Sequence, residues 1–278
     1  MRMVATDLDG TIVAADGTVS ARTLAAFRAC ADAGVDVVFV TGRPPRWMVP
    51  IAEATGHRGE AVCGNGALVV DLATFEVIRA HPLAPETVTE VARRLRNALP
   101  GLAFAVETVD GYRREPGYLP RYETPADIQV GELSELLADR PTVIKLLCRQ
   151  DGEHRLSADG MLARARELLA GLAEPVHSNP AGNLLEVSEL GVSKASTLAE
   201  LAALRGIDAA DVVAFGDMPN DVPMLRWAGR GYAMSGGHPE AVAAAGRTAP
   251  PLAEDGVAQV LEELLGLAGS GGTGARLA

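Results

Sequence analysis

Two aspartates end the first apolar run of the chain. Residues 4–13 read VATDLDGTIV, so Asp7 and Asp9 stand two positions apart and are followed at once by Gly-Thr. Side chains at i and i+2 on a strand point to the same face, and two carboxylates so close repel each other unless a cation lies between them or one is protonated. The pair is therefore either a solvated strand end with a glycine turn or half of a chemical site.

Further polar positions are predicted to lie at the same edge of a parallel sheet. The apolar run 35–42 predicts a strand that ends near Thr41, and the run 211–217 predicts one that ends at Asp217. Lys194 begins a predicted helix, where an ammonium adds to the positive end of the helix dipole and favours an anion. Ligands of an open parallel sheet bind outside the carboxyl ends of its strands, so we expect these groups to share one crevice.

Each of these positions also has a purely structural explanation. Asp217, Asn220 and Asp221 can cap the helix that follows them, because Asp and Asn favour that position. Thr41 and Gly42 can form a plain turn, and a lysine in the first turn of a helix is tolerated when it is exposed. What favours a site is the gathering of two acid pairs, an asparagine and a lysine at one predicted edge.

The composition limits the classes of function. The 278 residues are 48% hydrophobic and carry a formal net charge of −11, which allows one large or two modest domains and disfavours nucleic acid and anionic membranes as partners. Cys30, Cys63 and Cys148 are far apart without a CxxC pair, so we expect neither a disulfide framework nor a zinc site. The N-terminus runs almost directly into a strand and no apolar stretch could span a bilayer, so we expect a soluble cytoplasmic protein.

Strands and helices alternate in the first and last parts of the chain, which predicts an α/β fold with a parallel sheet. The rhythm changes after residue 82 and resumes near residue 185. We therefore expect a discontinuous core, residues 1–82 and 185–265, with a second domain inserted at residues 83–184. The Gly-rich tail, residues 266–278, is predicted to be disordered.

Four short motifs resemble those of the haloacid dehalogenase (HAD) superfamily of phosphatases. They occur in the family's order and are DLDGT at 7–11, TGR at 41–43, Lys194, and GDMPND at 216–221. The GNGA run at 64–67 and the ending GYAM…DGVA are similar to the Cof-like branch of that family. In that branch a large α/β cap is inserted into a Rossmann-like parallel-sheet core between the second and third motifs, which is where the rhythm of this chain changes.

The resemblance implies a Mg²⁺-dependent phosphatase of small phosphorylated metabolites such as sugar phosphates. Asp7 would be the nucleophile that forms an aspartyl-phosphate, and Asp9 would protonate the leaving group and then deprotonate water. The magnesium ligands implied are Asp7, Asp9 through its backbone carbonyl, and Asp217, while Asp221 would either bind the metal directly or orient the water bound to it. The phosphate-binding groups implied are Thr41, Gly42, Lys194 and Asn220.

The inserted cap is expected to select the substrate. The stretch 111–121 concentrates Tyr112, Arg113 and Arg114, and Lys145 lies in a predicted cap strand. These side chains either offer donors to a polar leaving group or belong to an ordinary solvated loop and strand edge.

Two other functions stay open beside the phosphatase. A phosphohexomutase would use the same motifs to transfer the phosphoryl group within or between sugars. An inactive metabolite-binding module would predict a damaged motif, and none of the four is damaged. Gly236 stands where the Cof-like branch often has an asparagine, so we expect a shifted substrate preference. The expected partner is a small phosphorylated metabolite, and the oligomeric state stays open.

Overall fold

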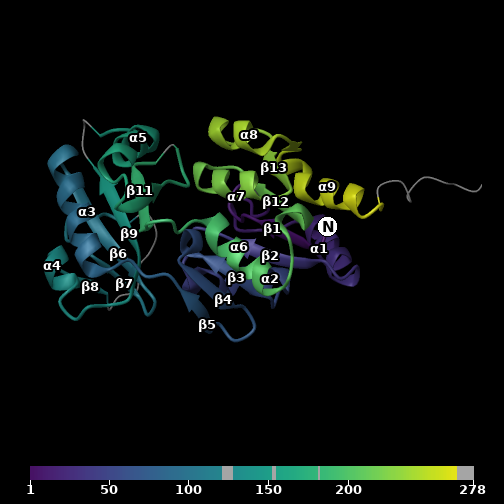
Figure 1. Ribbon diagram of the computed structural model, residues 1–278, viewed down its shortest axis with the longest axis horizontal. Helices are drawn as coiled ribbons and strands as arrows, with labels where there is room; N and C mark the ends of the chain where they lie inside the picture. Colours follow the sequence, from purple (N-terminus) through teal and green to yellow (C-terminus); the bar gives the residue numbers. More distant parts are fainter. Residues whose placement is uncertain (121–127, 152–154, 181, 268–278) are drawn as a thin grey trace, which may run out of the picture.

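The structure is a computed structural model that describes residues 1–120, 128–151, 155–180 and 182–267. Within these residues the chain forms two separate β-sheets (Figure 1). The larger has eight strands in the order β14-β13-β12-β1-β2-β3-β4-β5. They are β1 (Met3–Thr6), β2 (Asp36–Val40), β3 (Glu60–Cys63), β4 (Leu68–Asp71), β5 (Val77–Ala80), β12 (Val212–Gly216), β13 (Arg230–Met234) and β14 (Thr248–Ala249).

The larger sheet is parallel from β14 to β3, whereas β4 and β5 add antiparallel strands at one edge. Strands covered on both faces have continuous apolar sequences, as in the DVVFV of β2 and the VVAFG of β12. The expected Rossmann-like parallel-sheet core is confirmed. One face packs against α1 (Ala21–Asp32), α2 (Val49–Thr55) and α9 (Gly256–Leu264), and the other against α6 (Lys194–Leu204), α7 (Val222–Trp227) and α8 (Pro239–Ala245).

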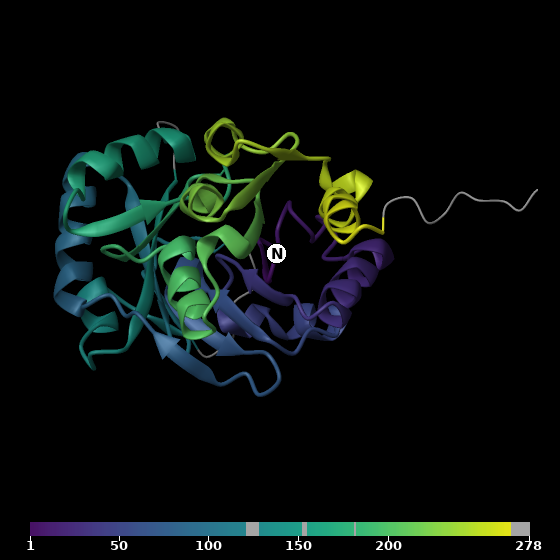
Figure 2. The same cartoon turned by 45° about the vertical axis from the view of Figure 1, so that its right-hand side comes forward.

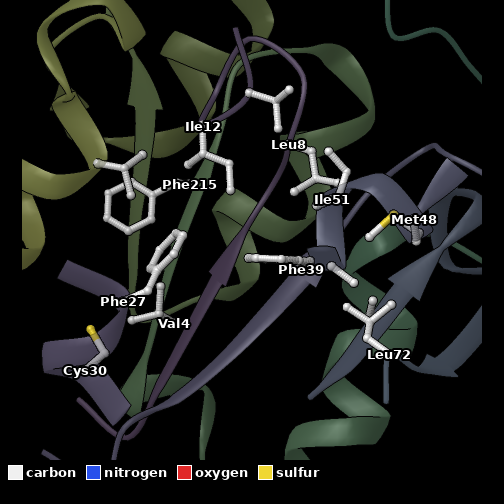
Figure 3. Packing of buried hydrophobic residues seen from close by; sticks show 14 of the residues in the cluster. Val4, Leu8, Ile12, Phe27, Cys30, Phe39, Met48, Ile51, Leu72 and Phe215 are labelled. Carbon is white, nitrogen blue, oxygen red and sulfur yellow. The ribbon is translucent and has the colours of Figure 1, made fainter. Parts of the chain in front are cut away.

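Aliphatic and aromatic side chains fill the space between the sheet and its helices. Phe39 of β2 and Phe215 of β12 point to the face of the sheet that α1 covers, where Phe27 of α1 packs against them (Figure 3). The ring centroids of Phe27 and Phe39 are 5.9 Å apart. Figure 2 shows α1 and α9 side by side at the end of the molecule far from the smaller sheet. This packing fixes the strands whose carboxyl ends carry the motifs, because cores packed to crystal-like density resist displacement.

The smaller sheet has six strands in the described residues, in the order β10-β11-β9-β6-β7-β8. They are β6 (Leu102–Thr108), β7 (Tyr112–Arg114), β8 (Gln129–Val130), β9 (Val143–Gln150), β10 (Ala173–Val176) and β11 (Leu184–Glu189). Its helices are α3 (Pro85–Ala98), α4 (Leu133–Leu136) and α5 (Ala158–Leu168). In Figure 1, α3 and α4 lie on the side of this sheet that is remote from the larger sheet.

The two faces of the smaller sheet differ in polarity. Alternate residues such as Phe104 and Val106 are buried against the helices. On the opposite face Glu107 of β6, Lys145 of β9 and Glu186 of β11 are almost fully buried as well, and each has a partner in the core. The face of the cap that is turned toward the core is therefore charged.

The division of the chain into core and cap stays a prediction, but the sheets move one of its boundaries. Residues 185–189 were expected in the core, yet β11 pairs with β9 and β10 in the smaller sheet. The apolar LLEVS pattern predicts a strand without saying which sheet accepts it, so the return to the core falls after Glu189. Residues 268–278 of the expected disordered tail lie outside the described residues. Among the described helices, none is both long and apolar enough to cross a membrane.

Candidate active site

Asp7, Lys194 and Asp221 form a buried ionic cluster where β1 and β12 end. Lys194 Nζ donates to Asp7 Oδ1 at 2.5 Å and to Asp221 Oδ1 at 2.6 Å, although Asp7 and Lys194 are 187 positions apart in the sequence. The ammonium is completely buried. Burial lowers the pKa of Lys194, but the carboxylates of Asp221 and Asp7 outweigh that effect and raise it above its ordinary value.

Two carboxylates face one ammonium in this cluster, and Asp217 adds a third carboxylate beside them. Burial raises the pKa of Asp217 to about 7, with the charge of Asp221 adding to the effect. Burial also raises the pKa of Asp7 well above its ordinary value, because the charges of Asp221 and Asp217 add to it and Lys194 offsets them only in part. The excess of carboxylates over ammonium in the cluster therefore favours the binding of another cation.

The donor set fits a hard divalent cation. One carboxylate oxygen from each of Asp7, Asp217 and Asp221 lies within 4.8 Å of the others. An all-oxygen set of this kind suits Mg²⁺, which prefers carboxylates and water in an octahedron. The residues present therefore fit the metal that the resemblance implies.

Two glycines make room for these carboxylates. A Cβ on Gly10 would lie 2.5 Å from Asp217 Oδ2, and the φ of Gly10 is +82°, a conformation that favours glycine. A Cβ on Gly216 would lie 2.5 Å from the Asp221 carboxyl carbon. The glycines of the DLDGT and GDMPND motifs thus have a steric reason in the structure.

Both oxygens of Asp221 already have protein partners. Oδ1 accepts from Lys194, and Oδ2 accepts the backbone N–H groups of Asp217 and Met218 at 3.0 Å each. The sequence left open whether Asp221 binds the metal directly or orients groups around it. These bonds favour the second role, in which Asp221 holds Lys194 and the loop that carries Asp217.

Asp9 lies at the exposed side of the site. Its carboxylate is 60% exposed, and both oxygens accept from Arg43, with Arg43 Nε 2.8 Å from Oδ2 and Nη2 2.6 Å from Oδ1. Arg43 was not among the expected site residues, although it belongs to the TGR motif. It orients the carboxylate expected to transfer the proton.

The expected phosphate-binding residues surround the cluster. Thr41 is buried, and its Oγ1 accepts the N–H of Arg43 at 3.0 Å, which leaves the hydroxyl hydrogen available for an anion. The Gly42 carbonyl accepts from Lys145 of the cap at 2.7 Å. Asn220 Nδ2 donates to Asn65 Oδ1 at 3.0 Å. The Oδ1 of Asn220 is also buried, and among the described residues it has no hydrogen-bond partner.

Glu186 is the centre of a hydrogen-bonded network between cap and core that the sequence did not predict. Its carboxylate accepts from Lys145 Nζ at 2.6 Å, Ser178 Oγ at 2.7 Å and Asn65 Nδ2 at 2.9 Å. Burial raises its pKa, but Lys145 and the other donors outweigh burial and lower it. A glutamate inside the apolar run LLEVS and the asparagine of GNGA were the signals available. Asn65 also adopts a positive φ of 60°.

The other expected cap residues have partners inside the cap. Arg113 pairs with Asp139 and donates to the Leu136 carbonyl, whereas Arg114 donates to backbone carbonyls of residues 115, 116 and 118. Tyr112 is buried, with Arg46 of the core 5.6 Å from its ring. Their contact with a substrate stays a prediction, and residue 121 lies outside the described residues.

A cavity of about 360 Å³ lies beside Asp217. Gly10, Ala14, Ser235 and Gly236 are among its lining residues. Gly236 has a φ of +88°, and apart from its chain neighbours no described residue has an atom within 4 Å of the point where a Cβ would stand, so the space beside it is open.

The fold and the site together define a hydrolase class. A family model described as haloacid dehalogenase-like hydrolase matches residues 4–261. The chain belongs to this family, and the resemblance drawn from the four motifs is confirmed.

Curated relatives cover nearly the whole chain. It is 26% identical over 269 residues to the 5-amino-6-(5-phospho-D-ribitylamino)uracil phosphatase YitU of Bacillus subtilis (strain 168), covering 95% of this chain and 98% of that protein. It is 30% identical over 244 residues to the HMP-PP phosphatase of Yersinia pseudotuberculosis (serotype I, strain IP32953), covering 86% and 85%. Both relatives are named phosphatases, and the expected enzyme is confirmed at the level of this class.

A solved structure shares the fold. A haloacid dehalogenase-like hydrolase from B. subtilis superposes with a TM-score of 0.79 at 21% identity, covering 95% of this chain and 100% of that chain. At this identity the comparison supports the two-sheet architecture alone.

Proposed function

We propose that the protein is a Mg²⁺-dependent phosphatase that releases phosphate from a small phosphorylated metabolite through an aspartyl-phosphate on Asp7. The observation that supports it most is the buried cluster at the strand ends, in which Lys194 pairs with Asp7 and Asp221 and an oxygen of Asp217 lies within 4.8 Å of theirs. A catalytic carboxylate in such a cluster repels a phosphate dianion until a cation is bound.

The residues have separate roles in this proposal. Lys194 holds Asp7 Oδ1, which directs the other oxygen of Asp7 to the phosphorus. When bound by Asp7, Asp217 and the Asp9 carbonyl, Mg²⁺ would neutralise the charge that keeps the carboxylate and the phosphate apart. Thr41 and Lys194 stabilise the oxygens of the transferring phosphoryl group, where charge develops.

Asp9 is proposed to transfer the proton. Its carboxylate protonates the leaving oxygen in the first step and removes a proton from water in the second. Arg43 donates to both oxygens of Asp9 and so orients the carboxylate, and each oxygen keeps a lone pair for the leaving group or for water.

The substrate is proposed to be a small phosphorylated metabolite in the cytoplasm. Both relatives are named as phosphatases of small phosphorylated compounds. The charged cap face around Lys145 and Glu186 would lie over the leaving group, and the three cysteines are buried and free, which suits a reducing compartment.

The test is phosphate release from a panel of phosphorylated sugars, nucleotides and cofactors, with Mg²⁺ or with EDTA. Asp7→Asn should lower turnover by about 10⁶-fold, the scale for loss of a covalent nucleophile. Asp32→Asn changes an exposed helix residue and is the matched control. Mg²⁺-dependent release that persists undiminished in Asp7→Asn would rule out this mechanism.

The same panel separates the phosphatase from the mutase alternative. A phosphatase releases inorganic phosphate in proportion to substrate consumed. A phosphohexomutase would instead leave the phosphoryl group on a sugar, and phosphorus NMR of the reaction mixture distinguishes the two products.

A further inference from the structure

Asp159, His177 and His238 form a second polar cluster, which lies outside the catalytic cluster. Asp159 is in the first turn of α5, His177 follows β10, and His238 immediately precedes α8. His177 Nε2 is 2.7 Å from Asp159 Oδ1, and His238 Nε2 is 3.1 Å from the same oxygen. Two elements of the cap and one of the core therefore meet at a single carboxylate oxygen.

The three side chains have the chemistry of a transition-metal site. One ligand atom from each lies within 4.8 Å of the others. Two imidazole nitrogens and a carboxylate oxygen are the donor set of open zinc sites, which keep a fourth position for water. Imidazole favours Zn²⁺ and similar ions over Mg²⁺, which prefers oxygen. The cysteine pattern predicted no zinc site, and this set contains no cysteine.

The surroundings of the cluster also suit an ion. His177 is completely buried, its ring centroid lies 5.8 Å from that of His238, and within the described residues its Nδ1 has no hydrogen-bond partner. The Asp159 side chain is 52% exposed, which gives a dissolved ion access. Arg166 of α5 pairs with Glu240 of α8 at 3.3 Å, so these elements already meet beside the cluster.

We propose that Asp159, His177 and His238 form a second metal site, selective for Zn²⁺-like ions over Mg²⁺, that ties the cap to the core. On binding, each imidazole proton moves from Nε2 to Nδ1, and both Nε2 lone pairs and the Asp159 oxygen bind the ion. The bond from the Glu240 N–H to His238 Nδ1, 3.2 Å in the present structure, is given up.

An ion at this site would act on the catalytic loop as well as on the cap. The backbone N–H of His238 donates to the Asp217 carbonyl at 2.7 Å. Fixing His238 to the cap therefore fixes the segment behind a proposed Mg²⁺ ligand. This consequence rests on the proposed function, whereas the metal site itself does not.

The first test is Co²⁺ titration of the full chain with Mg²⁺ in excess, followed by visible absorption. Four- or five-coordinate Co²⁺ absorbs strongly, whereas Co²⁺ in an octahedral oxygen site absorbs weakly. We expect one strongly absorbing Co²⁺ per chain in the wild type. His177→Gln and His238→Gln should each weaken its binding by more than about 10- to 100-fold, the cost of losing an outer-shell partner.

The controls separate this site from the others. His81→Gln removes an imidazole outside the cluster, and Asp217→Asn disables the catalytic cluster; both should retain the absorption. No strong absorption in the wild type, its retention in His238→Gln, or its loss in either control overturns the proposal. His238 is partly exposed, so His238→Gln keeps the test valid if the buried His177→Gln fails to fold.

The second test is turnover. Filling the site with Zn²⁺ should slow phosphate release by about 5- to 150-fold, the usual range for coupling between two sites, and His238→Gln should abolish this inhibition. Unchanged turnover with the site filled overturns the tie between cap and core. Absence of phosphatase activity in every protein would contradict the proposed function instead, and the absorption result would stand.

Discussion

Lys194 and Lys145, the two lysines of the chain, both lie buried in ion pairs, but the charge around them differs. Lys194 in the core pairs with Asp7 and Asp221, and Asp217 lies close to them. The pKa values of Asp7 and Asp217 are raised. Lys145 in the cap meets one carboxylate, Glu186, whose pKa is lowered.

This difference in charge distinguishes a candidate ligand site in the core from a structural connection in the cap. In the cap, one ammonium, one hydroxyl and one amide satisfy the Glu186 carboxylate, so the network is complete without a ligand. In the core, the carboxylates exceed the nearby positive charge, so the folded protein stores repulsion that a cation relieves. A buried charge whose partners are complete needs no ligand, whereas an unbalanced buried charge is a candidate site for one.

The largest effects are expected when each lysine is replaced in turn. Lys194→Met leaves three carboxylates without an ammonium and should destabilise the metal-free fold by about 3–5 kcal/mol, the cost of breaking a buried ion pair. Phosphate release should be lost, because Lys194 holds Asp7 Oδ1 and is proposed to stabilise the phosphoryl oxygens. Denaturant unfolding and the phosphate assay measure the two effects.

Lys145→Met is the matched variant in the cap. It should lower stability by a similar amount, since Glu186 stays buried, but it should leave measurable turnover. Equal loss of activity in the two variants would contradict the distinction between site and connection and would make Lys145 part of the catalytic machinery.

The next effect is the coupling within the cap network. Lys145→Met alone leaves a buried charge, and adding Glu186→Gln removes it while keeping the acceptor for Ser178. We expect the double variant to be more stable than the sum of the single variants predicts, by about 0.5–3 kcal/mol. A double-mutant cycle by urea unfolding measures this coupling. Strict additivity would mean that the two side chains do not act as a pair.

The two clusters should respond to pH in opposite directions when metal is removed with EDTA. The folded pKa of Glu186 is below its ordinary 4.5, so its stabilisation is present above about pH 4.5 and is lost as pH falls through the folded pKa. The folded pKa of Asp217 is about 7 against 3.8, so its contribution is present below about pH 3.8 and is lost as pH rises through about 7.

Stability curves against pH for Glu186→Gln and Asp217→Asn isolate the two contributions. Glu186→Gln should lose the slope at low pH and keep the other, whereas Asp217→Asn should reduce the slope between about pH 4 and about pH 7 and leave the part that comes from the raised pKa of Asp7. Added Mg²⁺ should flatten the range between about pH 4 and about pH 7 in the wild type, and an unchanged slope there would argue against metal binding by the cluster.

The smallest effects are expected when Gly10 and Gly236, two glycines with similar backbone conformations, are each replaced by alanine. Gly10→Ala and Gly236→Ala both place a Cβ in the left-handed region, which costs about 1–2 kcal/mol. The new Cβ meets Asp217 only at Gly10, and displacement of a catalytic group by about 1 Å can lower turnover about 10²-fold. Thermal unfolding should therefore shift to lower temperature in both variants, and further in Gly10→Ala, while phosphate release falls only in Gly10→Ala. A loss of activity in Gly236→Ala would assign that position a role in catalysis.

Local sequence patterns were sufficient to predict the parallel core and the four motifs. Apolar runs such as residues 35–42 mark strands covered on both faces, and a polar residue at the end of each run marks the edge where a site forms. The membership of β11 was not predictable, because a strand pattern is the same in either sheet. Its pairing with β9 joins segments more than thirty positions apart, which no local pattern specifies.

The sequence by itself determined which groups we propose for the chemistry, because Asp7, Asp9, Asp217 and Lys194 stand at strand ends and a helix start that local patterns predict. Only the tertiary structure decided which of these groups touch. It set Lys194 between two carboxylates, placed Glu186 against Asn65, and brought two histidines to Asp159. The physical reason is that contacts between residues tens or hundreds of positions apart depend on how the two sheets pack, and no local periodicity encodes that distance.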